Sequence, residues 1–134
     1  MILADTSGLL SLYNRREPTH TSVADVVAQE PGPFVVSPYV IAELDYLVAT
    51  RLGADAEQRV LAELASPAYV LASVDRDDLH ACTELISRYA GIGVTDASML
   101  VLADRLGIDR VLTLDRRHFE VARTPLGRAL AIVP

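Results

Sequence analysis

Short runs of apolar residues alternate along this chain with longer segments in which apolar side chains recur every three or four positions. A short apolar run between turn residues is typical of a strand buried on both faces, and the wider spacing is typical of a helix with one buried face. The apolar runs predict five strands, at residues 1–4, 34–37, 69–72, 111–114 and 130–133.

The segments between the runs predict helices at residues 5–13, 18–29, 38–52, 54–65, 75–89 and 95–106, and a short turn or helix at 115–121. Asp5 and Thr95 are expected to cap free helix amides, Pro38 to open a helix, and Gly53 and Gly107 to end helices. Because strands alternate with helices, we expect a three-layer α/β/α domain around a mostly parallel sheet. No repeat or linker interrupts the pattern, so residues 1–134 are interpreted as a single domain.

The amino-acid composition excludes several kinds of catalysis and leaves the predicted fold unchanged. The chain is 51% apolar and 22% charged, a globular composition. All 12 basic residues are arginine. The absence of lysine excludes P-loop nucleotide hydrolysis and Schiff-base catalysis, which both require that side chain. The net charge of -6 argues against a broad basic surface for nucleic acid, so any such surface must be local.

The chain carries no sign of a membrane segment or a secretion signal. Its longest apolar stretch, residues 34–42, is interrupted by Ser37 and Pro38 and is far shorter than a membrane span. Asp5 breaks the apolar start, and no basic segment precedes it. Cys82 is the only cysteine, which excludes an internal disulfide, and we interpret it as a buried helix residue. These features predict a cytoplasmic protein with no membrane partner.

Four acidic residues stand where a parallel sheet places its ligand site, just beyond the carboxyl ends of strands. Asp5 follows the first predicted strand, Asp115 follows the fourth, Asp96 opens the helix before that strand, and Glu43 lies in the long helix after the second. No matching buried bases are evident. Four acids gathered at one edge need a divalent cation to coexist, and Mg²⁺ prefers carboxylate and water oxygens.

Each acid also has an ordinary interpretation. Asp5 and Asp96 suit helix caps, Asp115 suits a turn, and Glu43 suits a solvent-exposed position. Asp45 is an alternative to Glu43. At about 100° per residue the two side chains point to opposite sides of the helix, so at most one faces the site.

Four segments resemble, in order, the signature blocks of the PIN-domain family: Ile2-Leu-Ala-Asp5-Thr-Ser, Ser37-Pro-Tyr-Val-Ile-Ala-Glu43-Leu-Asp-Tyr, Asp96-Ala-Ser-Met-Leu-Val-Leu-Ala and Leu112-Thr-Leu-Asp115-Arg-Arg-His-Phe. The resemblance runs over essentially the whole chain, and the size is similar to that of VapC toxins. It implies that Asp5, Glu43, Asp96 and Asp115 are catalytic carboxylates that bind Mg²⁺ or Mn²⁺. It also implies that Thr6 or Ser7, together with Thr113, orient them.

The activity that the resemblance implies is metal-assisted hydrolysis of phosphodiester bonds in structured RNA. Arg116, Arg117 and His118, beside the last acid, are candidates for contacts to RNA phosphates, with a solvated basic turn as the alternative. The similarity to VapC toxins further implies a VapB-type antitoxin, a homodimer, and an antitoxin arginine that competes with the cation.

Residues of two helices carry more apolar side chains than one buried stripe requires. We expect part of this set to form a groove for an amphipathic antitoxin helix. The set is Leu9, Leu10, Leu12, Tyr13, Tyr39, Val40, Leu44, Leu47 and Val48.

Other interpretations stay open. A housekeeping RNA-processing PIN nuclease usually carries extra segments, and an inactive PIN fold used for binding would not need four acids. A haloacid-dehalogenase-type phosphatase needs a second aspartate where Ser7 stands, and both it and a receiver domain need a lysine.

Overall fold

The computed structural model describes all 134 residues as five strands and seven helices. The strands are β1 (Ile2–Ala4), β2 (Phe34–Val36), β3 (Tyr69–Leu71), β4 (Arg110–Leu112) and β5 (Ala131–Val133). The helices are α1 (Thr6–Tyr13), α2 (His20–Gln29), α3 (Pro38–Leu52), α4 (Ala54–Leu64), α5 (Arg76–Arg88), α6 (Val94–Leu106) and α7 (Arg116–Val121).

The strands form one sheet in the order β3-β2-β1-β4-β5, and every neighbouring pair is parallel. Leu3 of the central strand pairs with Val35 on one side and with Val111 on the other. All three residues have no exposed surface, as expected for a parallel sheet covered on both faces. The predicted sheet is confirmed and is parallel throughout.

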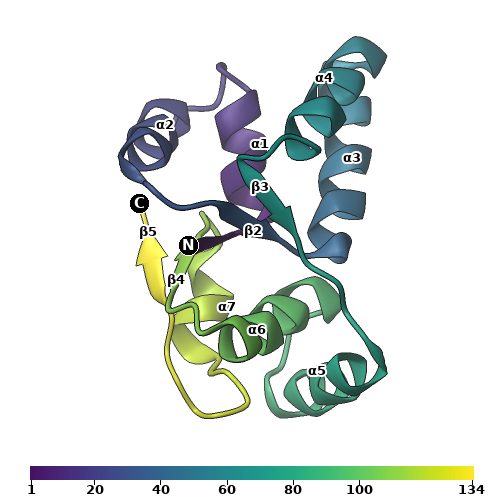
Figure 1. Cartoon of the computed structure of the whole chain (residues 1–134), viewed down its shortest axis with the longest axis vertical. Helices are drawn as coiled ribbons and strands as arrows, with labels where there is room; N and C mark the ends of the chain where they lie inside the picture. The colour runs from purple at the N-terminus through teal and green to yellow at the C-terminus, as the bar shows by residue number, and fades with distance from the viewer.

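Helices cover both faces of the sheet. α1 to α4 lie on one side of the strands, and α5 to α7 lie on the other (Figure 1). Right-handed crossovers account for this division, because the chain moves one way across the sheet from β1 to β3 and the other way afterwards. The expected three-layer α/β/α architecture is therefore confirmed.

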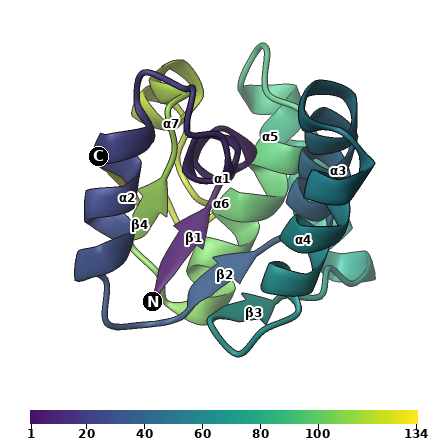
Figure 2. The same ribbon diagram turned by 90° about the horizontal axis from the view of Figure 1, so that it is seen from above.

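The sheet has its topological switch point between β1 and β4. From β1 the chain adds β2 and β3 on one side, and then returns to add β4 and β5 on the other. Figure 2 shows β1 between its two neighbours, with α1 continuing from its carboxyl end. Ligand sites in open α/β sheets form beyond the strand ends at such a point, because the connecting loops diverge there.

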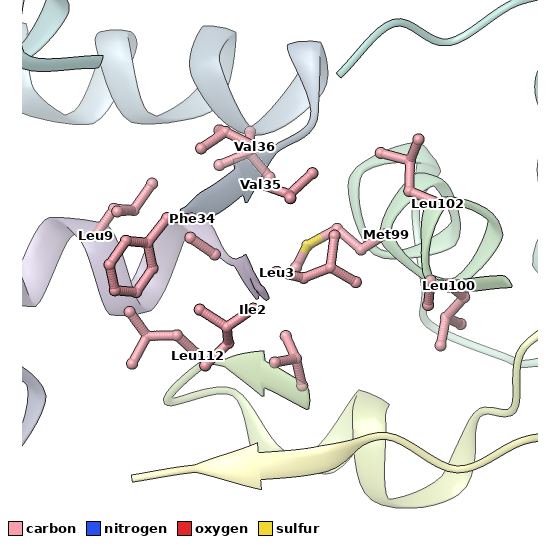
Figure 3. Close-up of a cluster of buried hydrophobic side chains, with 14 of the residues drawn as sticks. Ile2, Leu3, Leu9, Phe34, Val35, Val36, Met99, Leu100, Leu102 and Leu112 are labelled. Atoms are coloured by element: carbon pink, nitrogen blue, oxygen red, sulfur yellow. The ribbon is translucent and has the colours of Figure 1, made fainter. Parts of the chain in front are cut away.

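The core joins the sheet to a helix on each face. Figure 3 shows Met99 of α6 directed towards Leu3 of β1, and both are fully buried. On the opposite face α1 lies so close to β4 that a Cβ atom at Gly8 would stand 2.8 Å from the Leu112 carbonyl oxygen. Only glycine fits this contact, so Gly8 sets the distance between α1 and β4.

Two predicted boundaries near the candidate acids are wrong. β4 ends at Leu112 and not at residue 114, so Asp115 lies three residues beyond the strand rather than directly after it. α6 begins at Val94 with Gly93 as its N-cap, and no side chain caps it. The Thr95 hydroxyl donates to Glu43 Oε2 over 3.1 Å instead of capping the helix. Similarly, Asp5 stands at the N-cap of α1 but its side chain makes no capping hydrogen bond.

The apolar set on α1 and α3, part of which was expected to form a groove, divides into core residues and half-buried residues. Leu9, Leu10, Val40, Leu44 and Val48 are all buried. The other members of the predicted set, Leu12, Tyr13, Tyr39 and Leu47, are half-buried. The five buried members of the set are explained by the packing of α1 and α3 against the sheet and against each other.

Two other expectations concern single features. Cys82 is free and buried on α5, as predicted. None of the seven helices combines the length and the apolar character that crossing a membrane requires.

Candidate functional site

Asp5, Glu43, Asp96 and Asp115 line one pocket at the switch point of the sheet. Asp5 follows β1, Glu43 lies on α3, Asp96 lies in the first turn of α6, and Asp115 precedes α7. Four segments far apart in the sequence thus bring one carboxylate each to the same place. The grouping that the strand-end argument predicted is present.

Asp5 is held by two hydroxyl groups. Ser7 Oγ donates to Asp5 Oδ2 over 2.8 Å, and Thr113 Oγ1 donates to the same oxygen over 2.7 Å. Both hydroxyl protons are then in use, so the 3.1 Å approach of Ser7 Oγ to Thr113 Oγ1 is a contact and not a further hydrogen bond.

The same two hydroxyls accept backbone N–H groups. The amide of Leu114 donates to Ser7 Oγ over 2.9 Å, and that of Asp115 donates to Thr113 Oγ1 over 3.0 Å. These bonds tie the start of α1 to the segment after β4. Asp5 is itself buried, with 5% of its surface exposed, and Oδ1 is its only oxygen free of these bonds. The orienting role expected for Ser7 and Thr113 is therefore directed at Asp5.

Glu43 and Asp45 point to different sides of α3. Glu43 is exposed, lines the acid pocket and accepts from Thr95. Asp45 faces α4, where its hydrogen bond and its like charge raise the pKa of Glu57. The structure thus separates the two alternatives and places Glu43, not Asp45, in the pocket.

The negative charges of the other acids affect the pKa of Asp96. Burial, together with the negative charges of Asp5 and Asp115, raises its pKa to about 6, although His118 partly opposes this shift. His118 Nδ1 lies 3.0 Å from Asp96 Oδ2 and 3.5 Å from Asp115 Oδ2, without the geometry of a hydrogen bond to either. Its imidazole thus lies between these two carboxylates.

The three basic residues after Asp115 have different surroundings. His118 lies among the acids, and Arg116 Nη2 donates to the Pro134 carbonyl oxygen over 2.6 Å. Arg117 projects into solvent, with 86% of its side chain exposed and Nε 3.6 Å from Asp115 Oδ1. The expected basic cluster is therefore not one surface, and Arg117 is its member least engaged within the chain.

Sequence reasoning missed one residue of the pocket and one contact in the core. Arg51, in the last turn of α3, lines the pocket beside Glu43. Ser37 Oγ and Ser98 Oγ lie 2.7 Å apart in the core, where they join the start of α3 to the first turns of α6. An arginine about two helical turns beyond Glu43 in the same helix was a usable signal for Arg51. A serine pair 61 residues apart leaves no signal in one sequence.

The pocket is a cluster of acids and not a finished set of metal ligands. As the side chains stand, no three of the acidic, histidine or cysteine residues form a group that holds a metal ion. The donors are nevertheless of the right kind, because carboxylate oxygens suit hard divalent cations. Thr6 Oγ1 adds a buried oxygen at the same pocket with no hydrogen-bond partner. Side-chain rotation, chiefly of the exposed Glu43, is what coordination requires.

Asp96→Asn is expected to raise the free energy of unfolding of the metal-free protein at pH 7. The folded-state pKa of Asp96, about 6, lies above the ordinary 3.8. The folded state therefore binds this proton more tightly than the unfolded state does. The resulting penalty is absent below about pH 4, grows as the pH rises and is complete above about pH 6, where it reaches roughly 2–3 kcal/mol.

Urea titrations in EDTA across this pH range measure the effect. The free energy of unfolding of Asp96→Asn should rise relative to that of the wild type between pH 4 and pH 6. Asp25→Asn, which replaces an exposed carboxylate on α2, should show no such rise. Parallel curves for Asp96→Asn and wild type over that range would mean that Asp96 is not strained by its neighbours.

Comparison with known proteins places these residues in a family. Residues 2–124 match the model of the PIN domain family. The chain is 43% identical over 135 aligned residues to Ribonuclease VapC26 of Mycobacterium tuberculosis, and the alignment covers 99% of this chain and all of that relative.

Solved structures share the fold. VapC20 of Mycobacterium tuberculosis, described as a Sarcin-Ricin loop cleaving toxin, superposes with a TM-score of 0.81 at 23% identity, over 86% of this chain and 90% of that one. VapBC2 from Rickettsia felis, bound to a DNA fragment from its promoter, gives a TM-score of 0.72 at 18% identity, over the whole of both chains.

Proposed function

The chain belongs to the PIN-domain family, and we propose that it is a metal-dependent endoribonuclease, the toxin of a type II toxin–antitoxin pair. One observation carries the proposal: four carboxylates from four distant segments line a single pocket at the switch point of the sheet. The 43% identity to a ribonuclease over nearly the whole chain supports the same activity.

We propose that Asp5, Glu43, Asp96 and Asp115 hold Mg²⁺ or Mn²⁺. Hard oxygen donors of this kind favour these ions over softer metals. When bound, a divalent cation supplies positive charge for the phosphate oxygens and makes a water molecule more acidic. Its charge also offsets the repulsion among the acids, which adds to burial in raising the pKa of Asp96.

The chain's own residues prepare the site in different ways. Asp5 is fixed by Ser7 and Thr113, so its free oxygen keeps a constant direction. Glu43 is exposed on α3 and steadied by Thr95, which leaves it free to adjust to a ligand. One rigid and one adaptable carboxylate together allow the site to close around a cation and a phosphate.

Because the protein has a net charge of -6, RNA phosphates are expected to bind only where arginine side chains are exposed. Arg51 lines the acid pocket from α3, and it forms none of the ion pairs within the chain. Arg117 lies beside Asp115, with its Nε 3.6 Å from Asp115 Oδ1. We propose that these two side chains, rather than Arg116, bind phosphates on either side of the cleaved bond.

Arg51→Ala is expected to raise KM for RNA about fivefold with little change in kcat, since an exposed ion pair contributes up to ~1 kcal/mol. Initial rates over a range of RNA concentrations separate the two constants. Arg59→Ala, another exposed arginine on the neighbouring helix α4, is the matched control and should leave KM unchanged. Equal KM values for both variants would remove Arg51 from the RNA surface.

The proposed partner is a VapB-type antitoxin that inserts an arginine among the carboxylates. Such an arginine pairs with the acids that hold the cation, and so it inhibits by competition. Because five of the nine apolar residues of the set on α1 and α3 are core, the antitoxin is expected to contact the four half-buried ones. The homodimer stays a prediction, which light scattering of the purified protein checks.

The test mixes the purified protein with the product of its neighbouring gene and follows cleavage of cellular RNA. We expect cleavage that needs Mg²⁺ or Mn²⁺, stops with EDTA, is inhibited by the neighbour's product and is partly restored by high Mn²⁺. Cleavage without any such inhibitor would favour a housekeeping RNA-processing nuclease. RNA binding without cleavage at any metal concentration would favour an inactive PIN fold that serves as a binding module.

A further inference from the structure

A second pocket adjoins the acid pocket and shares His118 with it. Its walls are mainly apolar, with Ile92 buried at its base, Tyr89 half-buried at its side and Val121 exposed at its edge. It lies between the α5–α6 connection and α7. None of the acids that line the first pocket lines this one.

His118 is the wall between the two pockets. Its Nδ1 faces Asp96 and Asp115. Its Nε2 faces the α5–α6 connection, where a Cβ atom at Gly91 would stand 3.7 Å away. Gly91 has a φ of 88°, which L side chains rarely adopt, and this turn brings the connection against the ring. A ligand in the second pocket therefore lies one side chain away from the carboxylates.

Two arginines at the second pocket have little to bind within the chain. Arg88 forms none of the ion pairs of the structure. Arg117 makes only a 3.6 Å contact with Asp115 and is 86% exposed. An apolar, aromatic recess with two available cations suits a ligand that has both a flat apolar part and an anionic part.

We propose that this pocket binds one unpaired nucleotide of the RNA, adjacent to the bond that is cut. The base lies against Tyr89 and Ile92, and its phosphates contact Arg88 and Arg117. Unpaired bases are bound in proteins by stacking on aromatic rings and by arginine contacts to the backbone. The inference rests on the proposed ribonuclease activity and specifies its substrate: RNA with an unstacked nucleotide beside the cleavage site.

The charge favours RNA over a peptide of the antitoxin as the occupant. The pocket adjoins the proposed cleavage site across His118, and its two arginines suit the phosphates of a nucleotide next to the bond that is cut. An antitoxin arginine directed at the carboxylates would pass Arg88 and Arg117 against repulsion.

The test measures binding separately from cleavage. Asp5→Asn protein is titrated, in Mg²⁺, into short single-stranded oligouridines that each carry one 2-aminopurine at a different position. Stacking on Tyr89 should quench the fluorescence at one position only. Tyr89→Phe should keep this quenching, and Tyr89→Leu should remove it and weaken affinity about tenfold, as loss of one stacked base does.

Because Tyr89 also packs against the core, a second variant at an exposed residue is needed to separate loss of binding from loss of folding. Val121 is 67% exposed, so Val121→Asp should leave the melting temperature unchanged while its charge repels the phosphates. In the active protein this variant should raise KM about tenfold, and Leu126→Asp, at an exposed apolar residue outside both pockets, should not. Arg88→Ala should also raise KM, whereas Arg76→Ala, at the other end of α5, should not.

Each outcome decides between the proposals. Metal-dependent cleavage with unchanged KM in Val121→Asp and no position-specific quenching would overturn the nucleotide pocket and leave the ribonuclease intact. Normal RNA binding with loss of antitoxin binding in Val121→Asp would assign the pocket to the protein partner instead. A wild-type protein that neither binds nor cleaves RNA would overturn both.

Discussion

Asp5→Asn is expected to lower kcat for RNA cleavage by more than about 100-fold at saturating Mg²⁺, because even removal of residues that only support a metal ligand costs about 10- to 100-fold. The substitution changes charge and little else. Ser7 and Thr113 donate to the same oxygen of Asp5, so the asparagine carbonyl can take that place. The amide NH₂ group then occupies the position of the free oxygen and repels a cation.

The melting temperature of Asp5→Asn should consequently stay close to that of the wild type, which separates lost chemistry from lost folding. The matched control is Asp45→Asn. Asp45 lies on α3 but faces Glu57 of α4, so its substitution should leave kcat unchanged. Full activity of Asp5→Asn, or an equal loss in Asp45→Asn, would contradict the proposed carboxylate centre.

Gly8→Val is expected to lower the free energy of unfolding by about 3 kcal/mol or more and to reduce cleavage with it. Helix propensity alone predicts a gain, since glycine costs about 1 kcal/mol relative to alanine in a helix. Packing decides otherwise, because a Cβ atom here would stand 2.8 Å from the Leu112 carbonyl oxygen. That oxygen accepts the Asp5 amide over 2.9 Å and cannot withdraw without breaking the bond.

Overpacking of this kind costs about 1–3 kcal/mol per site, and a branched side chain adds to it. Gly8→Ala should therefore be destabilised less than Gly8→Val, but still destabilised. Urea titration measures both, and Ala62→Val, at an exposed position of α4, is the control for introducing valine into a helix. If Gly8→Ala were as stable as the wild type or more so, the close contact between α1 and β4 would be wrong.

The order of strands and helices was predictable because each element satisfies a local pattern. β1 and β2 are continuous apolar runs buried on both faces, and α3 begins at Pro38 and ends before Gly53 as the sequence indicates. The candidate site was predictable for a related reason: Asp5 and Asp115 follow neighbouring strands whose carboxyl ends topology brings together, whereas Asp96 lies in the first turn of α6.

Long-range contacts account for what the sequence did not reveal. The side chain of Asp5 was expected to cap α1 and instead binds Thr113, 108 residues away. Thr95 was expected to cap α6 and instead donates to Glu43, 52 residues away. For both residues, a local partner and a distant partner compete for the same hydroxyl or carboxylate group. The helix-capping propensity of Asp and Thr describes only the local partner. The sequence did not show which apolar residues of α1 and α3 are core and which are half-buried, because it does not reveal how many faces of a helix are covered.

The distance along the chain between Asp5 and Thr113 also sets when this centre can exist during protein synthesis. A ribosome adds about 5–20 residues per second, so the 108 residues between them take roughly 5 to 20 seconds. Throughout that interval β1 has emerged without β4, its neighbour in the finished sheet. The carboxylate pocket therefore cannot form on the nascent chain until β4 and the segment after it, which carries Asp115, have emerged.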